Sequence, residues 1–240
     1  MAVNKEEFKR IHDKLKRSSF QKRNIITSKA FSLDYLSYRI QRPIFKIKSN
    51  VFQKKNPKKP WLAPAAIEAL ELLIKPTDFG LEYGSGRSTI FFAPKVHHLT
   101  SVEHHKGWYE KVSRELKHNG IDNVDYIFAP PNKELPQVQF TSETQHFTPT
   151  DLYPIPDDFF TDYINVLDRF PNEKFDFILI DGRARTSSSF KALAKLKPGG
   201  LLILDQSERI RYQTVIKALS DWEKIYTTTG LTDTTIWRKP

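Results

Sequence analysis

The chain has 240 residues, of which 39% are hydrophobic and 12% aromatic, so it can bury one sizeable core and is not a disordered protein. It contains no cysteine, which excludes disulfide bonds, thiolate catalysis and cysteine-ligated metal sites. The net charge of +10 has one source: residues 1–60 hold 17 Lys and Arg against 4 Asp and Glu, and the remaining residues hold 21 against 24.

The N-terminal quarter, residues 1–60, is predicted to be a basic and partly helical extension. It lacks the apolar segment of a secretory signal, and no apolar run approaches the ~20 residues that cross a bilayer, so we expect a soluble cytoplasmic protein. Apolar residues at helical spacing predict a helix over 5–17. A second apolar stretch, 31–45, is broken by Pro43, and 53–60 is predicted to be an exposed basic linker.

Three interpretations of this extension remain open. Its charge suits contact with an anionic membrane surface, or nucleic acid binding with aromatic side chains available for stacking. It also suits a helical arm that packs on the rest of the chain or on a second subunit. We favour the arm, because one group of apolar and aromatic residues needs burial: Phe31, Leu33, Tyr35, Leu36, Tyr38 and Ile40.

From Trp61 onward strands alternate with helices. Five buried strands are predicted at 78–83, 97–103, 123–129, 174–181 and 201–205, and two short ones at 224–229 and 233–239. Helices are predicted at 65–75, 88–93, 108–120, 157–169, 188–196 and 208–220, with a turn at 197–200. Such alternation predicts an α/β fold with a doubly wound, mostly parallel sheet.

A glycine-rich loop follows the first strand, and an acidic residue ends the second. Gly84 and Gly86 allow a sharp turn and close approach of a ligand, and Glu103 lies 19 residues after Gly84. In doubly wound folds an acidic residue at that place binds ribose hydroxyls, so we expect a nucleoside-bearing cofactor. Bulky residues stand here at the position where a dinucleotide-binding fold has its third glycine. Together with Glu82 before the loop, this favours a ligand with a cationic ammonium and sulfonium over a pyrophosphate.

Four segments, LEYGSGRST, SVEHHKGWYEKV, FDFILIDGRAR and LKPGGLLILD, resemble the successive motifs of class I S-adenosylmethionine methyltransferases in order and spacing, over about residues 61–240. The resemblance implies a seven-stranded sheet with an antiparallel last strand, and S-adenosylmethionine as cofactor. It implies that Gly84 and Gly86 line the methionine portion, with Glu82 near its ammonium. Glu103 would hold the ribose and His104 would lie beside the adenine. Ser85 and Ser88 of the same loop complete the predicted cofactor residues.

Two further carboxylates end strands on the expected acceptor side. Asp181 and Asp205 are candidate catalytic residues that take a proton from a hydroxyl acceptor, because ligands of open parallel sheets bind at the carboxyl ends of strands. Metal-dependent relatives suggest Mg²⁺ on Asp181, Asp205 and Gln206, although Gln206 departs from their usual Asp or Asn. The alternative is that both aspartates cap the following loops or bind the cofactor and Arg183.

Substrate contacts are predicted at two places. Arg183 and Arg185 could clamp an acidic acceptor or form surface ion pairs. A long polar insertion, 130–172, is expected to select the substrate, and His146 within it is a candidate general base or a solvated histidine.

The sequence supports three functions. The first is a methyltransferase that modifies an oxygen of a small molecule or glycan. The others are an RNA methyltransferase that holds phosphates with its basic arm, and a non-catalytic nucleoside-binding module. Domain boundaries are predicted at 1–60 for the extension and 61–240 for the cofactor-binding domain.

Overall fold

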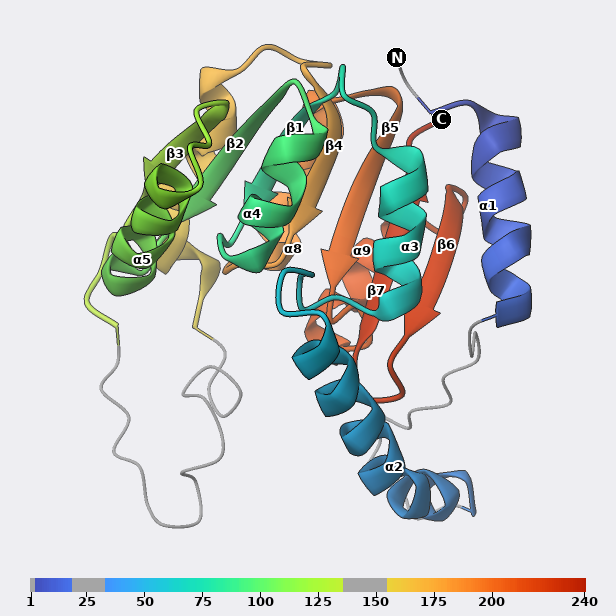
Figure 1. Ribbon diagram of the computed structural model, residues 1–240. Coiled ribbons are helices and arrows are strands. Elements are labelled where there is room, and N and C mark those ends of the chain that lie inside the picture. The colour runs from blue at the N-terminus through green and yellow to red at the C-terminus, as the bar shows by residue number, and fades with distance from the viewer. Residues whose placement is uncertain (1–2, 19–32, 136–154) are drawn as a thin grey trace.

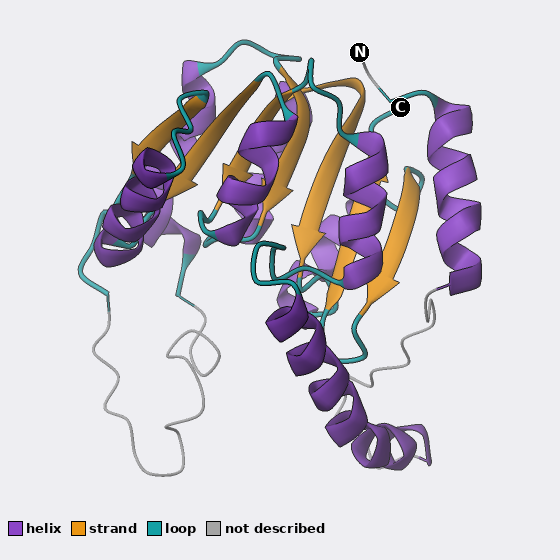
Figure 2. Cartoon of the chain, in the orientation of Figure 1, coloured by secondary structure: helices purple, strands orange, loops and turns teal. Residues whose placement is uncertain are grey.

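The computed structural model describes residues 3–18, 33–135 and 155–240, which form a seven-stranded sheet with helices on both faces (Figures 1 and 2). The strand order is β3-β2-β1-β4-β5-β7-β6, and β7 runs antiparallel to both of its neighbours. The strands are β1 Phe79–Tyr83, β2 His98–Glu103, β3 Val124–Phe128, β4 Phe175–Ile180, β5 Leu196–Asp205, β6 Glu223–Thr228 and β7 Asp233–Arg238. The predicted α/β architecture and the antiparallel last strand are therefore confirmed.

The helices cover the sheet from both sides (Figure 2). The α-helices are α1 Lys5–Ser18, α2 Leu33–Lys55, α3 Pro64–Leu73, α4 Arg87–Phe92, α5 Lys106–His118, α7 Thr161–Asn165, α8 Arg185–Lys195 and α9 Gln213–Ala218. The 3-10 helices are η1 Ala93–Lys95, η2 Asp157–Phe160, η3 Val166–Arg169 and η4 Ile210–Tyr212. No helix of the described residues combines the length and the apolar character that a membrane crossing requires.

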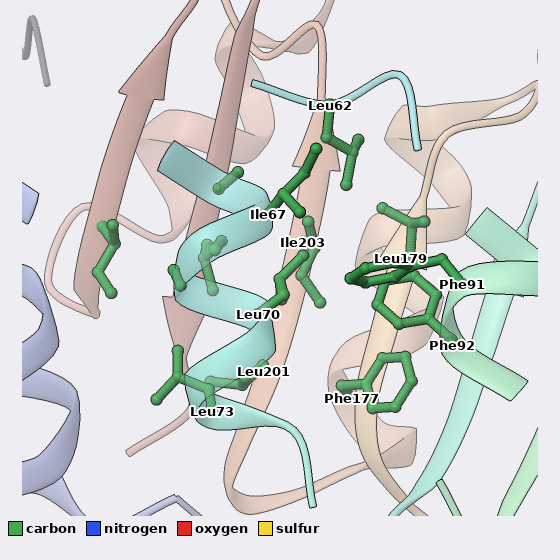
Figure 3. Close-up of a cluster of buried hydrophobic side chains, with 14 of the residues drawn as sticks. Leu62, Ile67, Leu70, Leu73, Phe91, Phe92, Phe177, Leu179, Leu201 and Ile203 are labelled. Atoms are coloured by element: carbon green, nitrogen blue, oxygen red, sulfur yellow. The ribbon is translucent and has the colours of Figure 1, made fainter. Parts of the chain in front are cut away.

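Strand β4 shows why the sheet is sandwiched between helices. All six of its residues are buried, and successive side chains of a strand point to opposite faces. Phe177 and Leu179 pack with α3 and α4 on one face, in the cluster of Figure 3, whereas Ile178 and Ile180 belong to the cluster on the other face. A strand in the middle of a two-sided core must be apolar along its whole length, which explains the continuous run FDFILI.

Helix α1 is part of the core. Its residues Phe8, Ile11 and Leu15 are at most 4% exposed and join the cluster that contains α3. Lys5, Lys9, Arg10 and Lys14 of α1 are exposed on its other faces, as an amphipathic surface helix requires. The first part of the extension thus packs on the sheet domain, while the predicted boundary at residue 60 stays a prediction.

Helix α2 differs from expectation. Pro43 lies inside the helix and does not end the apolar stretch. The axis of α2 bends in Figure 1, because proline has no N–H group to donate a helical hydrogen bond. The body of this chain does not bury Leu36 and Ile40, which are 44% and 70% exposed, whereas Tyr38 is half-buried. Three side chains of the same group lie outside the described part: Phe31, Leu33 and Tyr35.

Three other predictions need correction. The helix expected at 157–169 is divided into η2, α7 and η3, and its buried residues are Phe160, Tyr163, Val166 and Leu167. The turn at 197–200 is an irregularity within β5, where Leu196 pairs with Phe175 and Leu201 with Phe177. The helix expected at 208–220 is shorter and consists of η4 and α9.

Candidate cofactor and acceptor site

The loop after β1 lies directly against the loop after β4. Gly84 has φ +92°, and a Cβ atom there would lie 2.8 Å from the backbone of Gly182. The N–H of Gly84 donates to the carbonyl of Val102 at 2.9 Å, and that of Asp181 donates to the carbonyl of Tyr83 at 2.9 Å. Because a side chain at Gly84 would force the loops apart, the glycine is required for the ends of β1, β2 and β4 to meet.

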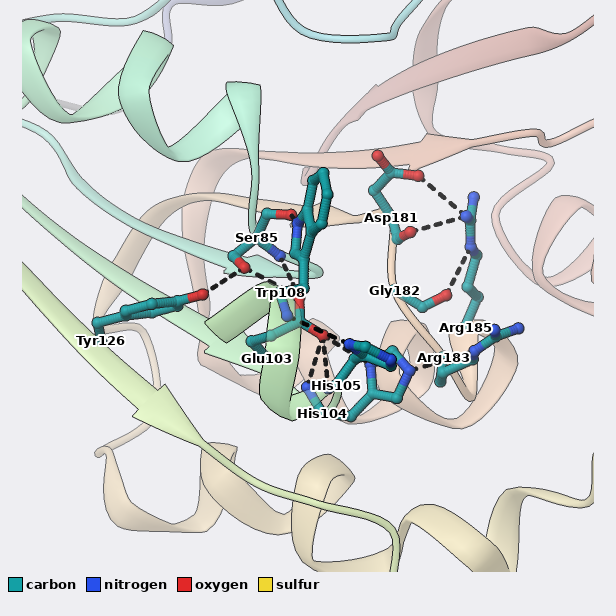
Figure 4. A network of polar contacts seen from close by, with 10 residues as sticks. All are labelled: Ser85, Glu103, His104, His105, Trp108, Tyr126, Asp181, Gly182, Arg183 and Arg185. Atoms are coloured by element: carbon teal, nitrogen blue, oxygen red, sulfur yellow. Dashed lines mark hydrogen bonds and ion pairs between the residues drawn. The ribbon is translucent and has the colours of Figure 1, made fainter. Parts of the chain in front are cut away.

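Glu103, at the end of β2, binds the glycine-rich loop (Figure 4). Its Oε2 accepts from the N–H and the hydroxyl of Ser85 at 3.1 and 2.9 Å, and that hydroxyl also lies 2.6 Å from the Tyr126 hydroxyl. Oε1 accepts from the N–H groups of His104 and His105 at 2.9 and 2.8 Å. Burial alone would raise the pKa of Glu103, but hydrogen bonds from His104, His105 and Ser85 outweigh it and lower the pKa, so the carboxylate is ionised at neutral pH.

His104 lies beside this carboxylate. Its Nδ1 is 3.0 Å from Oε1 of Glu103, and its Nε2 accepts a long hydrogen bond of 3.5 Å from Nε of Arg183. The imidazole also meets the rings of Phe160 and Tyr163 edge to face, with centroids 5.6 and 5.8 Å apart. The ring therefore has a fixed orientation at the wall of the site.

Glu82 lies beneath the loop and does not line the cavity. It is fully buried, and Oε1 accepts hydrogen bonds from the hydroxyls of Thr89 and Ser101. Burial raises the pKa of Glu82 to about 7, against hydrogen bonds from Ser88, Thr89 and Ser101 that lower it. This placement does not support the expected contact between Glu82 and a ligand ammonium; the carboxyl group holds the start of α4 in place.

A cavity of about 930 Å³ opens at the carboxyl ends of β1, β2, β4 and β5. Residues from all four of these ends line it, among them Gly84, Ser85, Glu103, His104, Asp181 and Gln206. A smaller cavity of about 360 Å³ lies on the other side of the loop, between Trp61 and Trp108. Ser85, Trp108 and Asp181 line both cavities, so these three residues lie where the two spaces meet.

Arg185 occupies the space between the two acceptor-side aspartates. Its Nη2 donates to Oδ1 of Asp181 at 2.9 Å, and its Nη1 donates to the backbone carbonyl of Asp205 at 2.5 Å and lies 3.7 Å from Oδ2 of that residue. Burial, followed by the neighbouring Asp181, raises the pKa of Asp205 to about 7, although Arg185 opposes the shift. Burial also raises the pKa of Asp181, against Arg185 and a hydrogen bond from Asp205 that lower it.

The residues predicted to hold Mg²⁺ do not fit a metal ion. The guanidinium of Arg185 already lies between Asp181 and Asp205, where the cation would have to sit. Asp205 is 4% exposed and does not line either cavity, and among the described residues no three His, Cys, Asp or Glu side chains gather to hold a metal. Of the three predicted ligands, Asp181 and Gln206 line the larger cavity.

The other predicted residues fall into three groups. Gly86 and Ser88 line the smaller cavity, and Arg183 lines the larger one. Arg185 also lines the larger cavity, but it is 8% exposed and paired with both aspartates, which agrees with the alternative of ion pairing, although the ion pairs are not at the surface. His146 lies outside the described residues.

Sequence reasoning missed several residues at the site. Trp108 is the first residue of the helix predicted at 108–120; its Nε1 donates to the carbonyl of Ser85 at 2.5 Å, and the residue lines both cavities. The signal was its place, one turn after the end of β2 and at the start of α5. Arg209 and Arg211, which also line the larger cavity, follow Asp205 in the loop after β5.

Comparison with known proteins gives the fold. No protein-family model and no curated protein sequence matches the chain. A methyltransferase-like protein from Silicibacter pomeroyi is similar in structure with a TM-score of 0.52 and 22% identity, over 76% of this chain and 89% of that one. At this identity the similarity establishes the fold and not the activity.

Two further structures from Aquifex aeolicus are similar at lower TM-scores. An S-adenosylmethionine-dependent methyltransferase gives 0.46 at 13% identity, over 77% of this chain and 95% of that one. A tRNA (m1A58) methyltransferase gives 0.45 at 12% identity, over 71% and 66%. No conclusion is drawn from these two. Strand order and the similarity to the Silicibacter protein give the chain a class I methyltransferase fold.

Proposed function

We propose that the chain is an S-adenosylmethionine-dependent methyltransferase that modifies an oxygen of an acidic small molecule or glycan. One observation carries this proposal: the loop residue Ser85 and the carboxylate of Glu103 are hydrogen-bonded to each other on the wall of a single cavity. A glycine turn beside an ionised carboxylate at the end of the next strand suits a nucleoside with a ribose diol. The bound cofactor supplies an activated methyl group and its own leaving group.

Glu103 is placed to hold the ribose. Both of its oxygens already accept hydrogen bonds from the protein, so a ribose hydroxyl that binds Glu103 must replace one of the present donors or donate beside it. The hydroxyl of Ser85 is the one that can yield, because it keeps Tyr126 as a partner at 2.6 Å when it turns away. His104, held by Glu103 and Arg183, offers its ring to the adenine as the resemblance implies.

Asp181 is the candidate proton acceptor. Its side chain is 29% exposed and lies where the two cavities meet, whereas Asp205 is buried behind it. The ion pair with Arg185 fixes the carboxylate, and a raised pKa brings it closer to neutrality, which favours general base catalysis. Asp205 and Arg185 are positioning residues that act through Asp181.

The acceptor side of the cavity is cationic. Arg183, Arg209 and Arg211 line it, together with the aromatic ring of Tyr212. Guanidinium groups bind carboxylates and phosphates with paired hydrogen bonds, so an acceptor that carries one of these groups suits this wall. This supports an acidic small molecule or glycan as the acceptor.

The test is a methyl-transfer assay with labelled S-adenosylmethionine and three separate acceptor pools: acidic small molecules, glycans, and total RNA. Asp181→Asn should lower turnover about 10²- to 10⁴-fold while the affinity for S-adenosylhomocysteine is kept, because only the proton acceptor is lost. Asp221→Asn, an exposed aspartate outside both cavities, is the matched control and should behave as the wild type.

Each alternative predicts a different result. An RNA methyltransferase labels the RNA pool, with activity that falls steeply as salt rises. A non-catalytic module binds the cofactor and labels no pool. Full turnover by Asp181→Asn would remove Asp181 from the mechanism.

A further inference from the structure

Helix α2 carries a stripe of exposed apolar side chains. We call Leu36, Ile40, Ile44, Ile47 and Val51 the α2 stripe, and their exposed fractions are 44%, 70%, 52%, 63% and 44%. Their spacings of four, four, three and four residues place all five on one side of an α-helix. Single exposed apolar residues are ordinary, but a continuous row of five on one helix marks an interaction surface.

The α2 stripe is not the face with which α2 packs on its own chain. Phe52 packs against the core cluster that contains α3, and the ring of Phe45 lies against Gly230. At the same end of the helix, Arg87 donates a hydrogen bond of 3.1 Å to Oε1 of Gln53. The helix is therefore fixed to the body by one side, and the α2 stripe faces outward.

The positive charge of α2 indicates which kind of partner binds the α2 stripe. Between Leu33 and Lys55 the helix has one acidic residue, Asp34, and six basic ones: Arg39, Arg42, Lys46, Lys48, Lys54 and Lys55. A second copy of α2 would bring two strongly basic helices together, and their like charges oppose that contact. A nucleic acid would satisfy the cations but offers no apolar layer to five aliphatic side chains. An anionic lipid surface offers both hydrocarbon and negative headgroups.

We propose that α2 docks the protein on an anionic membrane surface, with the α2 stripe in the apolar layer and the flanking Lys and Arg side chains on the headgroups. The 23 residues of α2 follow about 35 Å of bent helix axis at 1.5 Å per residue, and the side that carries the α2 stripe lies against the interface. It projects from the edge of the molecule at which β1, β4 and β5 end (Figure 1), so the membrane and the large cavity are on the same side. This proposal does not depend on the methyltransferase activity.

The test is co-sedimentation of the full chain with vesicles of phosphatidylcholine alone and of phosphatidylcholine mixed with phosphatidylserine. We expect binding to the mixed vesicles only, weakened by salt. The double variant Ile40→Glu/Ile47→Glu should bind them about tenfold less or worse, because two apolar anchors are replaced by charges. Ile210→Glu is the matched control, because Ile210 is exposed to a similar degree, 65%, outside α2, and it should bind as the wild type.

Three results would overturn the proposal. The first is a wild-type protein that stays in solution with the anionic vesicles. The second is a double variant that binds them as well as the wild type. The third is a dimer in light scattering that the double variant dissociates, which would assign the stripe to a second copy. Thermal unfolding of the double variant at the wild-type temperature shows that lost binding does not come from lost folding.

Discussion

The buried carboxyl group of Glu82 should make the free energy of unfolding depend on pH. Its pKa is raised by burial from 4.5 to about 7, so the folded protein favours the protonated form. The contribution of the protonated Glu82 to the free energy of unfolding is fully present below pH 4.5 and is lost as the pH rises through about 7. The shift in pKa corresponds to a loss of about 3 kcal/mol. Glu82→Gln keeps the neutral form, so at pH 8 it should be up to about 3 kcal/mol more stable than the wild type.

Urea unfolding between pH 5 and pH 8 measures this difference. The wild type should lose stability across the interval more steeply than Glu82→Gln, with the remaining slope arising in part from Asp205, whose pKa is also about 7. Glu110→Gln, at an exposed position of α5, serves as the control. Parallel slopes for wild type and Glu82→Gln would show that the burial of Glu82 does not perturb its ionisation.

Removal of the Arg185 side chain should be strongly destabilising. Arg185→Met leaves Asp181 and Asp205 facing each other without a cation, and loss of one partner of a buried ion pair costs about 3–5 kcal/mol. The cost should be smaller at pH 5 than at pH 8, because protonation of Asp205 removes the repulsion below its pKa of about 7. Thermal unfolding at both pH values is the measurement, and equal losses would contradict the ion-pair account.

At the residue scale, the sequence predicts positions better than contacts. The spacing from Gly84 to Glu103 indicates that the loop after β1 lies beside the end of β2, and Ser85 of this loop donates to Glu103, because β1 and β2 are adjacent parallel strands. It does not reveal that Arg185 lies between Asp181 and Asp205, since that depends on how the side chain of one helix residue folds back over the ends of β4 and β5. The metal site predicted from the sequence did not take this ion pairing into account.

At the scale of elements, α1 offers a test of how the extension is joined to the body. Phe8 is 2% exposed within the core cluster, so Phe8→Ala should cost about 3–5 kcal/mol of unfolding free energy. Phe190→Ala, at a position that is 41% exposed on α8, should cost less than about 1 kcal/mol. Chemical denaturation compares the two, and equal small losses would mean that α1 adds little to the core.

Helices and strands whose apolar residues follow one clear period can be predicted from the sequence, and those with a mixed apolar pattern cannot. Continuous apolar runs located β4 and most of β5, because an interior parallel strand is buried on both faces. The region of η2, α7 and η3 was predicted as one helix, because a repeat of three residues and one of 3.6 look alike over so short a distance. In α2 apolar residues were expected to be buried, yet Phe45 and Phe52 pack on the body and the α2 stripe stays exposed.

At the scale of the whole molecule, the parallel sheet brings segments that are distant in sequence together at one edge. The residues that line the large cavity come from the ends of four strands and from the segment before α7, so the site exists only when the sheet is complete. The order of strand and helix signals along the chain was enough to predict that edge. The position of α2 beside it was not predictable, because it depends on a few contacts such as Phe45 against Gly230.

The central claim is that the glycine-rich loop and Glu103 form a nucleoside site, and calorimetry with S-adenosylhomocysteine tests it most directly. The wild type should bind this ligand and give no heat with NAD, and Glu103→Gln should bind it about 10- to 100-fold more weakly while unfolding as a cooperative domain. Wild-type affinity in the Gln variant, or tight NAD binding without a response to S-adenosylhomocysteine, would contradict the claim.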